Sequence, residues 1–291
     1  MSLHTITVGS TLLKTTSFGS YISESSVHNY TVYTDKILLL DFFTVLVGDR
    51  IDNIIDMLEF LSKDDLFSSF PHISNVSEIY HGIPPDMDNK KRHLLNDVMK
   101  LNPDIASIHV VLPDGNIYLG EPYYQQEQHP KLNFADREWY TGVTKSNHTY
   151  VSSVFLSASI NTPAIAIAVP VLSDSENGRD PSTQNNRLLA HLVGIVNLQS
   201  VKELFNNLES NQFGRFYVLD KNGTELIDSF YIQKNTTINE FDFIDNSSLN
   251  EFLSRTTNSA FVSNQDNTVF FYKPISVRTG GELIAALVTE K

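Results

Sequence analysis

The chain has 291 residues and a mass of 32.8 kDa, and 41% of its residues are hydrophobic, which suffices for one large domain or two ordinary ones. Its formal net charge of -13 argues against a nucleic acid or an anionic membrane as the main partner, because these polyanions need clustered lysine and arginine. Without cysteine the chain has no disulfide, no thiolate metal site and no cysteine nucleophile.

Apolar residues at spacings of three and four predict one long helix over residues 35–62. Thr34 and Asp35 are suitable capping residues, and no proline follows until Pro71. The seam consists of Ile37, Leu40, Thr44, Val47, Ile51, Ile54, Leu58 and Leu61. This pattern is typical both of packing along the helix's own domain and of pairing with a second copy. Because about four heptads are short for a free coiled coil, we expect intramolecular packing, with a homodimer through this helix as an addition.

Beyond the helix the chain repeats one order of strands and turns. Each copy begins with two apolar runs around an Asp-Gly or Asn-Gly dipeptide, which is typical of a β-hairpin. A proline-containing strand and a closing strand follow in each copy. The three corresponding pairs are 108–118 with 216–227, 164–171 with 269–275, and 188–198 with 282–289. Tight hairpins favour antiparallel pairing, so the sequence predicts an α+β fold with two antiparallel-sheet modules in series, each with a helical middle.

The two modules meet near residue 205. Residues 200–210 predict a short helix, because Val201, Leu204, Phe205 and Leu208 fall on one face. The first module carries the longer insertions, at residues 122–133 and in a polar loop at 173–186.

Motifs for catalysis are missing from the sequence. It has no glycine-rich phosphate loop, no Gly-x-Ser-x-Gly turn and no His-Glu-x-x-His, and its nine histidines stand singly. A single histidine in an apolar strand, such as His109, is more often a packed residue or a turn neighbour than a ligand. We therefore expect no catalytic residues, no metal site and no cofactor.

One segment, Asp-Arg-Glu-Trp-Tyr at residues 136–140, contains the only tryptophan of the chain. Asp136 is a suitable helix N-cap, which would place Arg137, Trp139 and Tyr140 in a first turn that favours anions. A guanidinium can bind a carboxylate through two parallel hydrogen bonds, and the two aromatic rings add donors beside apolar surface. In the alternative interpretation both rings are core anchors and Arg137 pairs with a neighbouring acidic residue.

Five segments, in order, resemble the double Cache family of sensor domains. They are residues 136–140, 150–155, 166–171, 192–198 and 216–224, and the resemblance extends over about residues 35–288. It implies an α+β fold in which a long stalk helix (35–65) precedes two PAS-like modules, one membrane-distal (66–204) and one membrane-proximal (205–291).

Members of this family are extracytoplasmic sensing regions of histidine kinases and chemoreceptors, held between two membrane helices. Small ligands usually enter the distal module. The longest nearly apolar stretch here, residues 37–48, is shorter than the roughly 18 residues needed to cross a bilayer. The resemblance therefore implies an excised ectodomain, extracellular or periplasmic, that contacts the membrane only through flanking helices absent from this chain.

The resemblance also implies a binding site in the distal module. Arg137, Trp139 and Tyr140 match the positions that hold the ligand carboxylate in amino-acid-binding members. Leu132 and Phe155 replace expected tyrosines, and Val196 replaces an aspartate that would hold the ligand ammonium. Without that anion a buried ammonium would lose on the order of 2–5 kcal/mol. The implied ligand is a small organic carboxylate or an amino-acid-like molecule with an uncharged tail.

The sequence therefore predicts a small-molecule sensor domain without enzymatic activity, which relays a conformational shift through the stalk helix. Two alternatives stay open. One is an extracellular structural or protein-interaction module with a vestigial pocket. The other is a hydrolase that uses aspartate and glutamate side chains, which no spacing in the sequence supports.

Overall fold

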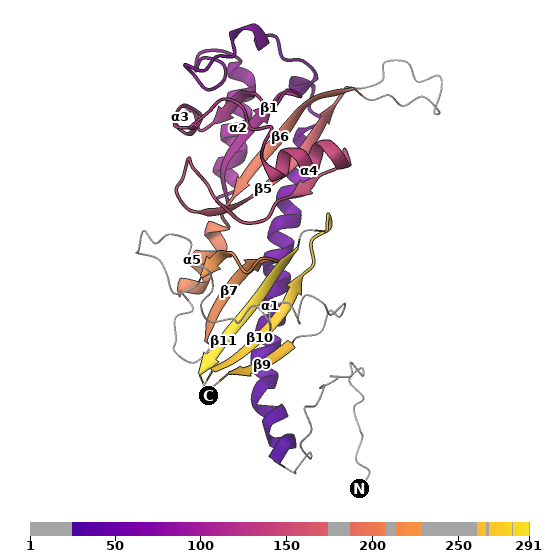
Figure 1. The fold of residues 1–291 in the computed structure, drawn as a ribbon, viewed down its shortest axis with the longest axis vertical. Helices are drawn as coiled ribbons and strands as arrows, with labels where there is room; N and C mark the ends of the chain where they lie inside the picture. The colour runs from indigo at the N-terminus through magenta and orange to yellow at the C-terminus, as the bar shows by residue number, and fades with distance from the viewer. Residues whose placement is uncertain are drawn as a thin grey trace, which may run out of the picture.

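The computed structural model describes residues 25–173, 187–207, 214–228, 261–265, 268–280 and 282–290. Helix α1 (Ser25–Leu61) runs along the molecule, with one sheet beside its C-terminal half and a second beside its N-terminal half (Figure 1). The helix begins at Ser25, before the predicted Asp35, because no proline or glycine between these residues stops it. No helix in the described ranges combines the length and apolar character needed to cross a bilayer.

The first sheet has the strand order β2-β1-β6-β5-β3, with β4 paired to β5, and every pairing is antiparallel. Its strands are β1 (Ile105–Val111), β2 (Ile117–Glu121), β3 (Tyr150–Val151), β4 (Phe155–Leu156), β5 (Pro163–Leu172) and β6 (Leu188–Val196). The helices of this half are α2 (Asn89–Leu101), α3 (Tyr123–Glu127) and α4 (Glu138–Ser146), with single 3-10 turns at Asp65–Ser68 (η1) and Ile73–Asn75 (η2).

The second sheet has the order β8-β7-β11-β10-β9, so its strands follow the same spatial sequence as those of the first. They are β7 (Arg215–Asp220), β8 (Glu225–Asp228), β9 (Phe261–Gln265), β10 (Thr268–Ile275) and β11 (Leu283–Glu290). The predicted α+β architecture, a long helix followed by two antiparallel sheets, is confirmed. Strand β9 was not predicted.

The two sheets are joined by α5 (Gln199–Asn207), and the predicted boundary near residue 205 falls within this helix. The structure describes this helix to Asn207, and residues 208–210 of the predicted helix lie outside the described ranges. The predicted helical middle of the second module and most of the predicted loop at 173–186 also lie outside them.

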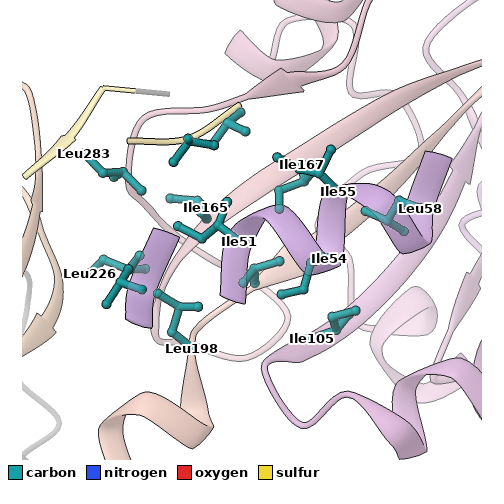
Figure 2. Close-up of a cluster of buried hydrophobic side chains, with 14 of the residues drawn as sticks. Ile51, Ile54, Ile55, Leu58, Ile105, Ile165, Ile167, Leu198, Leu226 and Leu283 are labelled. Carbon is teal, nitrogen blue, oxygen red and sulfur yellow. The ribbon is translucent and has the colours of Figure 1, made fainter. Parts of the chain in front are cut away.

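A single apolar core joins α1 to one face of both sheets. The predicted seam of α1 is buried from Leu40 to Leu61, and the two sheets supply Ile165, Ile167 and Leu226, among others (Figure 2). Each fully buried aliphatic side chain of this kind contributes roughly 1.5–3 kcal/mol. The intramolecular packing predicted for the helix is thereby confirmed. The homodimer stays a prediction. Among the described side chains of α1, Leu38, Phe42 and Val45 are exposed near its N-terminal half and Phe60 near its C-terminal end.

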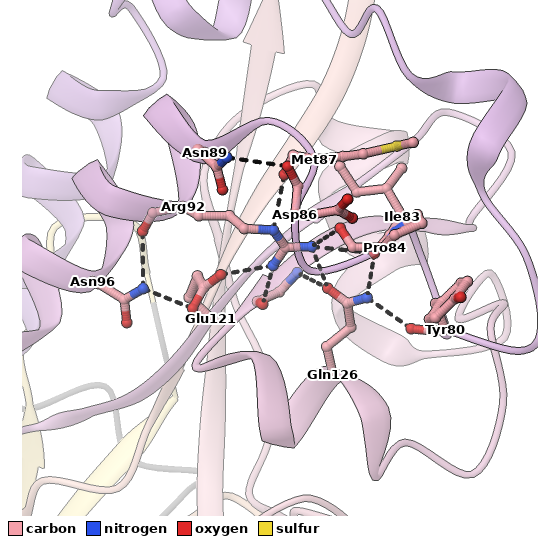
Figure 3. Close-up of polar contacts among 11 residues, drawn as sticks. Tyr80, Ile83, Pro84, Asp86, Met87, Asn89, Arg92, Asn96, Glu121 and Gln126 are labelled. Carbon is pink, nitrogen blue, oxygen red and sulfur yellow. Dashed lines mark hydrogen bonds and ion pairs between the residues drawn. The ribbon is translucent and has the colours of Figure 1, made fainter.

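A buried ion pair anchors α2, α3 and the segment before α2 to strand β2. Arg92 donates to Glu121 at 2.6 Å and to the side chain of Gln126 and several backbone carbonyl oxygens (Figure 3). Gln126 in turn accepts from the backbone N–H of Gly120 and donates to two carbonyl oxygens, those of Tyr80 and Ile83. Since a buried charge needs such complete hydrogen bonding, the network fixes the position of α3 and of the segment before α2.

Two acidic side chains, one on α1 and one on β7, connect the first sheet's part of the molecule to the second sheet's part. Glu59 of α1 accepts from Thr149, next to β3, and from Arg278 in the loop after β10 at 2.9 Å. Asp220, at the end of β7, accepts from the backbone N–H of Val154 at 3.0 Å. The segment between β3 and β4 is therefore attached to the second sheet as well as to the first.

Candidate functional site

A cavity of about 40 Å³ lies on the face of the first sheet that points away from α1. Side chains alternate along a strand, so Val193 and Ile195 of β6 line the cavity, whereas Leu192 and Val196 join the core against α1. The cavity is partly open to solvent, so a larger ligand can extend out of it or displace side chains of its wall.

The wall of the cavity is mostly apolar and aromatic. Its apolar members include Val111, Ile117, Phe134, Trp139, Phe155 and Ile195. The rings of Phe134 and Trp139 lie nearly parallel, with centroids 6.5 Å apart. Such a wall is typical of small-molecule sites, in which a few polar groups fix the orientation of the ligand.

Arg137 is the one charged residue among those that line the cavity. It is the N-cap of α4, and its guanidinium lies over the ring of Phe134, 5.5 Å from the centroid. Across the described residues no carboxylate forms an ion pair with it. The guanidinium is therefore available for an anion, and the alternative pairing with Asp136 or Glu138 is not observed.

The prediction of Asp136 as the N-cap was wrong. Its carboxylate accepts from Lys131 at 2.6 Å instead, and Arg137 caps the helix without a side-chain hydrogen bond. Glu138 accepts from Tyr150 and from the backbone N–H of Ser153. These bonds orient the first turn of α4 toward the segment that carries Phe155.

Two predicted site residues lie beside the cavity without lining it. The hydroxyl of Tyr140 donates to the carbonyl oxygen of Pro113 at 2.6 Å, which commits this donor to the β1–β2 hairpin. Leu132 is buried in the same apolar cluster as Trp139, and its carbonyl oxygen accepts from Ile117. Both residues support the wall from behind in this conformation.

Val196 lies on the opposite face of the sheet, fully buried in the core with α1. The structure thus brings Arg137, Trp139 and Phe155 together at the cavity, with Tyr140 and Leu132 next to them, and leaves Val196 out. The reason is the alternation of β6, which directs Ile195 to the cavity and its neighbour away from it.

Two buried histidines complete the polar part of the cavity. The rings of His109 and His129 meet edge to face with centroids 4.8 Å apart, and His129 also contacts the ring of Phe134. Nε2 of His109 lies 3.0 Å from Oγ of Ser107, within hydrogen-bond distance. Ser157 and Ser159 supply hydroxyls at the same cavity.

Both imidazoles are uncharged at neutral pH. Burial, with a smaller effect of His129, lowers the pKa of His109 well below its usual value. Burial lowers the pKa of His129 to about 4, and the neighbouring His81 and Arg137 side chains lower it further. The cavity therefore combines one permanent cation with neutral hydrogen-bonding groups.

The sequence held part of the information needed to find these histidines. His109 alternates with Ile108 and Val110, which face the α1 core, so it had to lie on the other face of β1. The expectation that it is simply a packed residue misses its place at the cavity. His129 follows α3 in an irregular segment, where no periodicity indicates direction. Within the described ranges, no three His, Asp or Glu side chains are arranged to hold a metal ion.

Comparison with known proteins assigns the family. The model of the family described as Cache domain matches residues 26–290, so this chain belongs to the Cache domain family. It is a sensor domain and not an enzyme. A search of curated proteins gave no match.

Solved structures of similar fold include three sensory proteins. The extracellular ligand-binding receptor of Desulfohalobium retbaense superposes with a TM-score of 0.62 at 12% identity, over 88% of this chain but 40% of that one. The extracellular domain of rpHK1S-Z16, assigned as a histidine kinase, superposes with a TM-score of 0.63 at 10% identity, over 91% of this chain and 97% of that one. The sensory domain of the Campylobacter jejuni chemoreceptor Tlp3 with isoleucine bound superposes with a TM-score of 0.58 at 15% identity, over 93% of this chain and 98% of that one.

Proposed function

We propose that this chain is the extracytoplasmic sensor region of a membrane receptor and that it binds a small carboxylate-bearing ligand in the cavity of the first sheet. The module of residues 66–204 is then membrane-distal and that of residues 205–291 membrane-proximal. The start of α1 and the end of β11 lie at the same end of the molecule, beside the second sheet (Figure 1). This arrangement suits a domain held between two membrane helices.

The observation that carries the proposal is the unpaired guanidinium of Arg137 at an otherwise uncharged, aromatic-walled cavity. In such surroundings a guanidinium and a carboxylate form strong, directional hydrogen bonds. The chemoreceptor Tlp3, which has the same fold, was crystallised with isoleucine, an amino acid that carries a carboxylate. The ligand here shares that group, while the cavity offers no acidic side chain for an ammonium.

Binding of such a ligand is expected to displace side chains of the wall, because the cavity is small although it is partly open to solvent. The ligand therefore favours a more open arrangement, and it shifts the equilibrium only by its difference in affinity for the two arrangements. Because α1 packs against both sheets, a shift of the distal module reaches the proximal one through this helix.

The test is a thermal-shift panel of small carboxylic acids and amino acids on the wild type and on Arg137→Ala. We expect at least one acid to raise the melting temperature of the wild type. The variant should bind that acid on the order of 10- to 100-fold more weakly, because a hydrogen bond to a charged group contributes about 1.5–3 kcal/mol.

Arg50→Ala is the matched control, since Arg50 is an exposed arginine of α1 away from the cavity. It should respond like the wild type. Equal responses of Arg137→Ala and the wild type would refute the anchoring role of Arg137. If no small molecule stabilises the wild type and a protein partner is captured instead, the chain is an interaction module with a vestigial pocket.

A further inference from the structure

The cavity contains hydrogen-bonding capacity that the protein leaves unused. Neither ring nitrogen of His129 has a hydrogen-bond partner within the described residues, and the same holds for Nδ1 of His109. The two side chains are more than nine-tenths buried. An unmet buried polar group is costly, on the order of 1–3 kcal/mol, so the two nitrogens of His129 indicate a partner that arrives from outside the chain.

The two imidazoles differ in what they can reach. Nδ1 of His109 faces strand β2, where a Cβ on Gly120 would lie only 2.3 Å from it. That nitrogen is therefore enclosed by the backbone, and the ring of His109 is fixed by Ser107 on its other side. His129 has both nitrogens free, lines the cavity and packs edge to face on His109. His129 is thus the group available to a ligand, and His109 supports it.

The charges around His129 restrict what it can bind. The groups that face it are His109 from β1, His81 from the segment before α2, and Phe134 and Arg137 from the segment before α4. No carboxylate lines the cavity in the described residues. A ligand ammonium would find no anion there, and a second ligand carboxylate would require protonation of a buried imidazole beside two other basic groups.

A neutral imidazole offers one N–H donor and one acceptor nitrogen, and a hydroxyl offers the same two functions. We infer that His129 is a specificity-determining residue that hydrogen-bonds an uncharged hydroxyl of the ligand, so that the ligand is a small hydroxy acid. Its carboxylate binds Arg137 and its hydroxyl binds His129. The inference rests on the proposed function of the same cavity and adds the second polar group of the ligand.

The experiment compares matched acids by isothermal titration calorimetry at pH 7.5. One series is lactate, propionate, alanine and malonate, and a larger one is 2-hydroxy-4-methylpentanoate, 4-methylpentanoate and leucine. In at least one series the hydroxy acid should bind the wild type about tenfold or more tightly than the acid without the hydroxyl. The amino acid and the dicarboxylate should both bind more weakly than the hydroxy acid.

His129→Phe tests the residue itself. In this variant the affinity for the hydroxy acid should fall to that for the acid without the hydroxyl. The affinity for the acid without the hydroxyl should stay unchanged. His191→Phe is the matched control, because His191 is a buried histidine that does not line the cavity. It should keep the wild-type preference.

The outcomes separate the two proposals. If no acid of either series binds the wild type, the carboxylate site and the hydroxy-acid inference fall together. If acids bind through Arg137 but the hydroxyl adds no affinity, or the amino acid binds best, only the inference is overturned. The ligand comparison on the wild type decides this even if His129→Phe does not fold.

Discussion

His191 is a buried imidazole that makes stability depend on pH. It lies 3.2 Å from the hydroxyl of Thr144, and burial lowers its pKa to about 4. Its unfolded-state pKa is about 6.5. The unfolded chain therefore binds more protons between pH 6.5 and pH 4, and stability falls as the pH falls through this window.

From this residue alone we expect the wild type to lose on the order of 2 kcal/mol of unfolding free energy between pH 7 and pH 5. His191→Leu removes the titrating group, so its loss over the same interval should be smaller by about that amount. Urea denaturation of both proteins at the two pH values measures the difference. Identical losses would contradict the buried, neutral state of His191.

Among single residues, the sequence predicted the site residues within the segment 136–140 better than those far from it along the chain. Arg137 and Trp139 share one helix start, so their common location follows from their spacing. Phe155 joins them because Glu138 holds the preceding segment, a contact no sequence pattern indicates. Val196 was matched to a ligand-holding aspartate through the family resemblance alone, and in a strand a difference of one residue reverses the face on which a side chain lies.

Among the secondary-structure elements, α1 depends on a glycine at its contact with the second sheet. Gly48 is buried, and a Cβ at this position would lie 2.8 Å from the carbonyl oxygen of Ser276. In an exposed helix Gly→Ala stabilises by roughly 0.5–1 kcal/mol. Here Gly48→Ala should instead destabilise by about 1–3 kcal/mol, because the backbone of the loop after β10 has to move.

Chemical denaturation of Gly48→Ala checks this expectation. Asn53→Ala is the control, since Asn53 is an exposed position of the same helix. It should be neutral or more stable by up to about 0.5 kcal/mol, from helix propensity alone. A stabilised Gly48→Ala protein would show that the close approach is not maintained in solution.

The elements with a strong period were predictable, and their ends were not. The seam of α1 follows from its spacing, but its start does not. The helix begins at Ser25, and the expected capping residues Thr34 and Asp35 are exposed positions inside it. The hairpins were indicated by Asp-Gly and Asn-Gly, and Gly115 and Gly223 do adopt positive φ. Strand β9 has no comparable turn dipeptide and gains its place only through pairing with β10.

On the scale of the whole molecule, the shared core predicts one unfolding transition. Buried residues of α1, the first sheet and the second sheet form one continuous apolar cluster. Separate domains with small polar interfaces unfold separately, whereas a continuous core couples them. Differential scanning calorimetry should give one peak with a ratio of calorimetric to van't Hoff enthalpy near one. Two resolved peaks would contradict this coupling.

The hydrogen bond between Val154 and Asp220 has a consequence for how force is transmitted. Val154 directly precedes Phe155, which forms part of the cavity wall, and Asp220 ends β7 of the second sheet. If a ligand widens the cavity at Phe155, as proposed, the movement acts on β7 through this hydrogen bond as well as on α1. In the proposed function the cavity is thus connected to the second sheet in two ways, through α1 and through this hydrogen bond, and we expect that fixing α1 alone would leave the second connection in place.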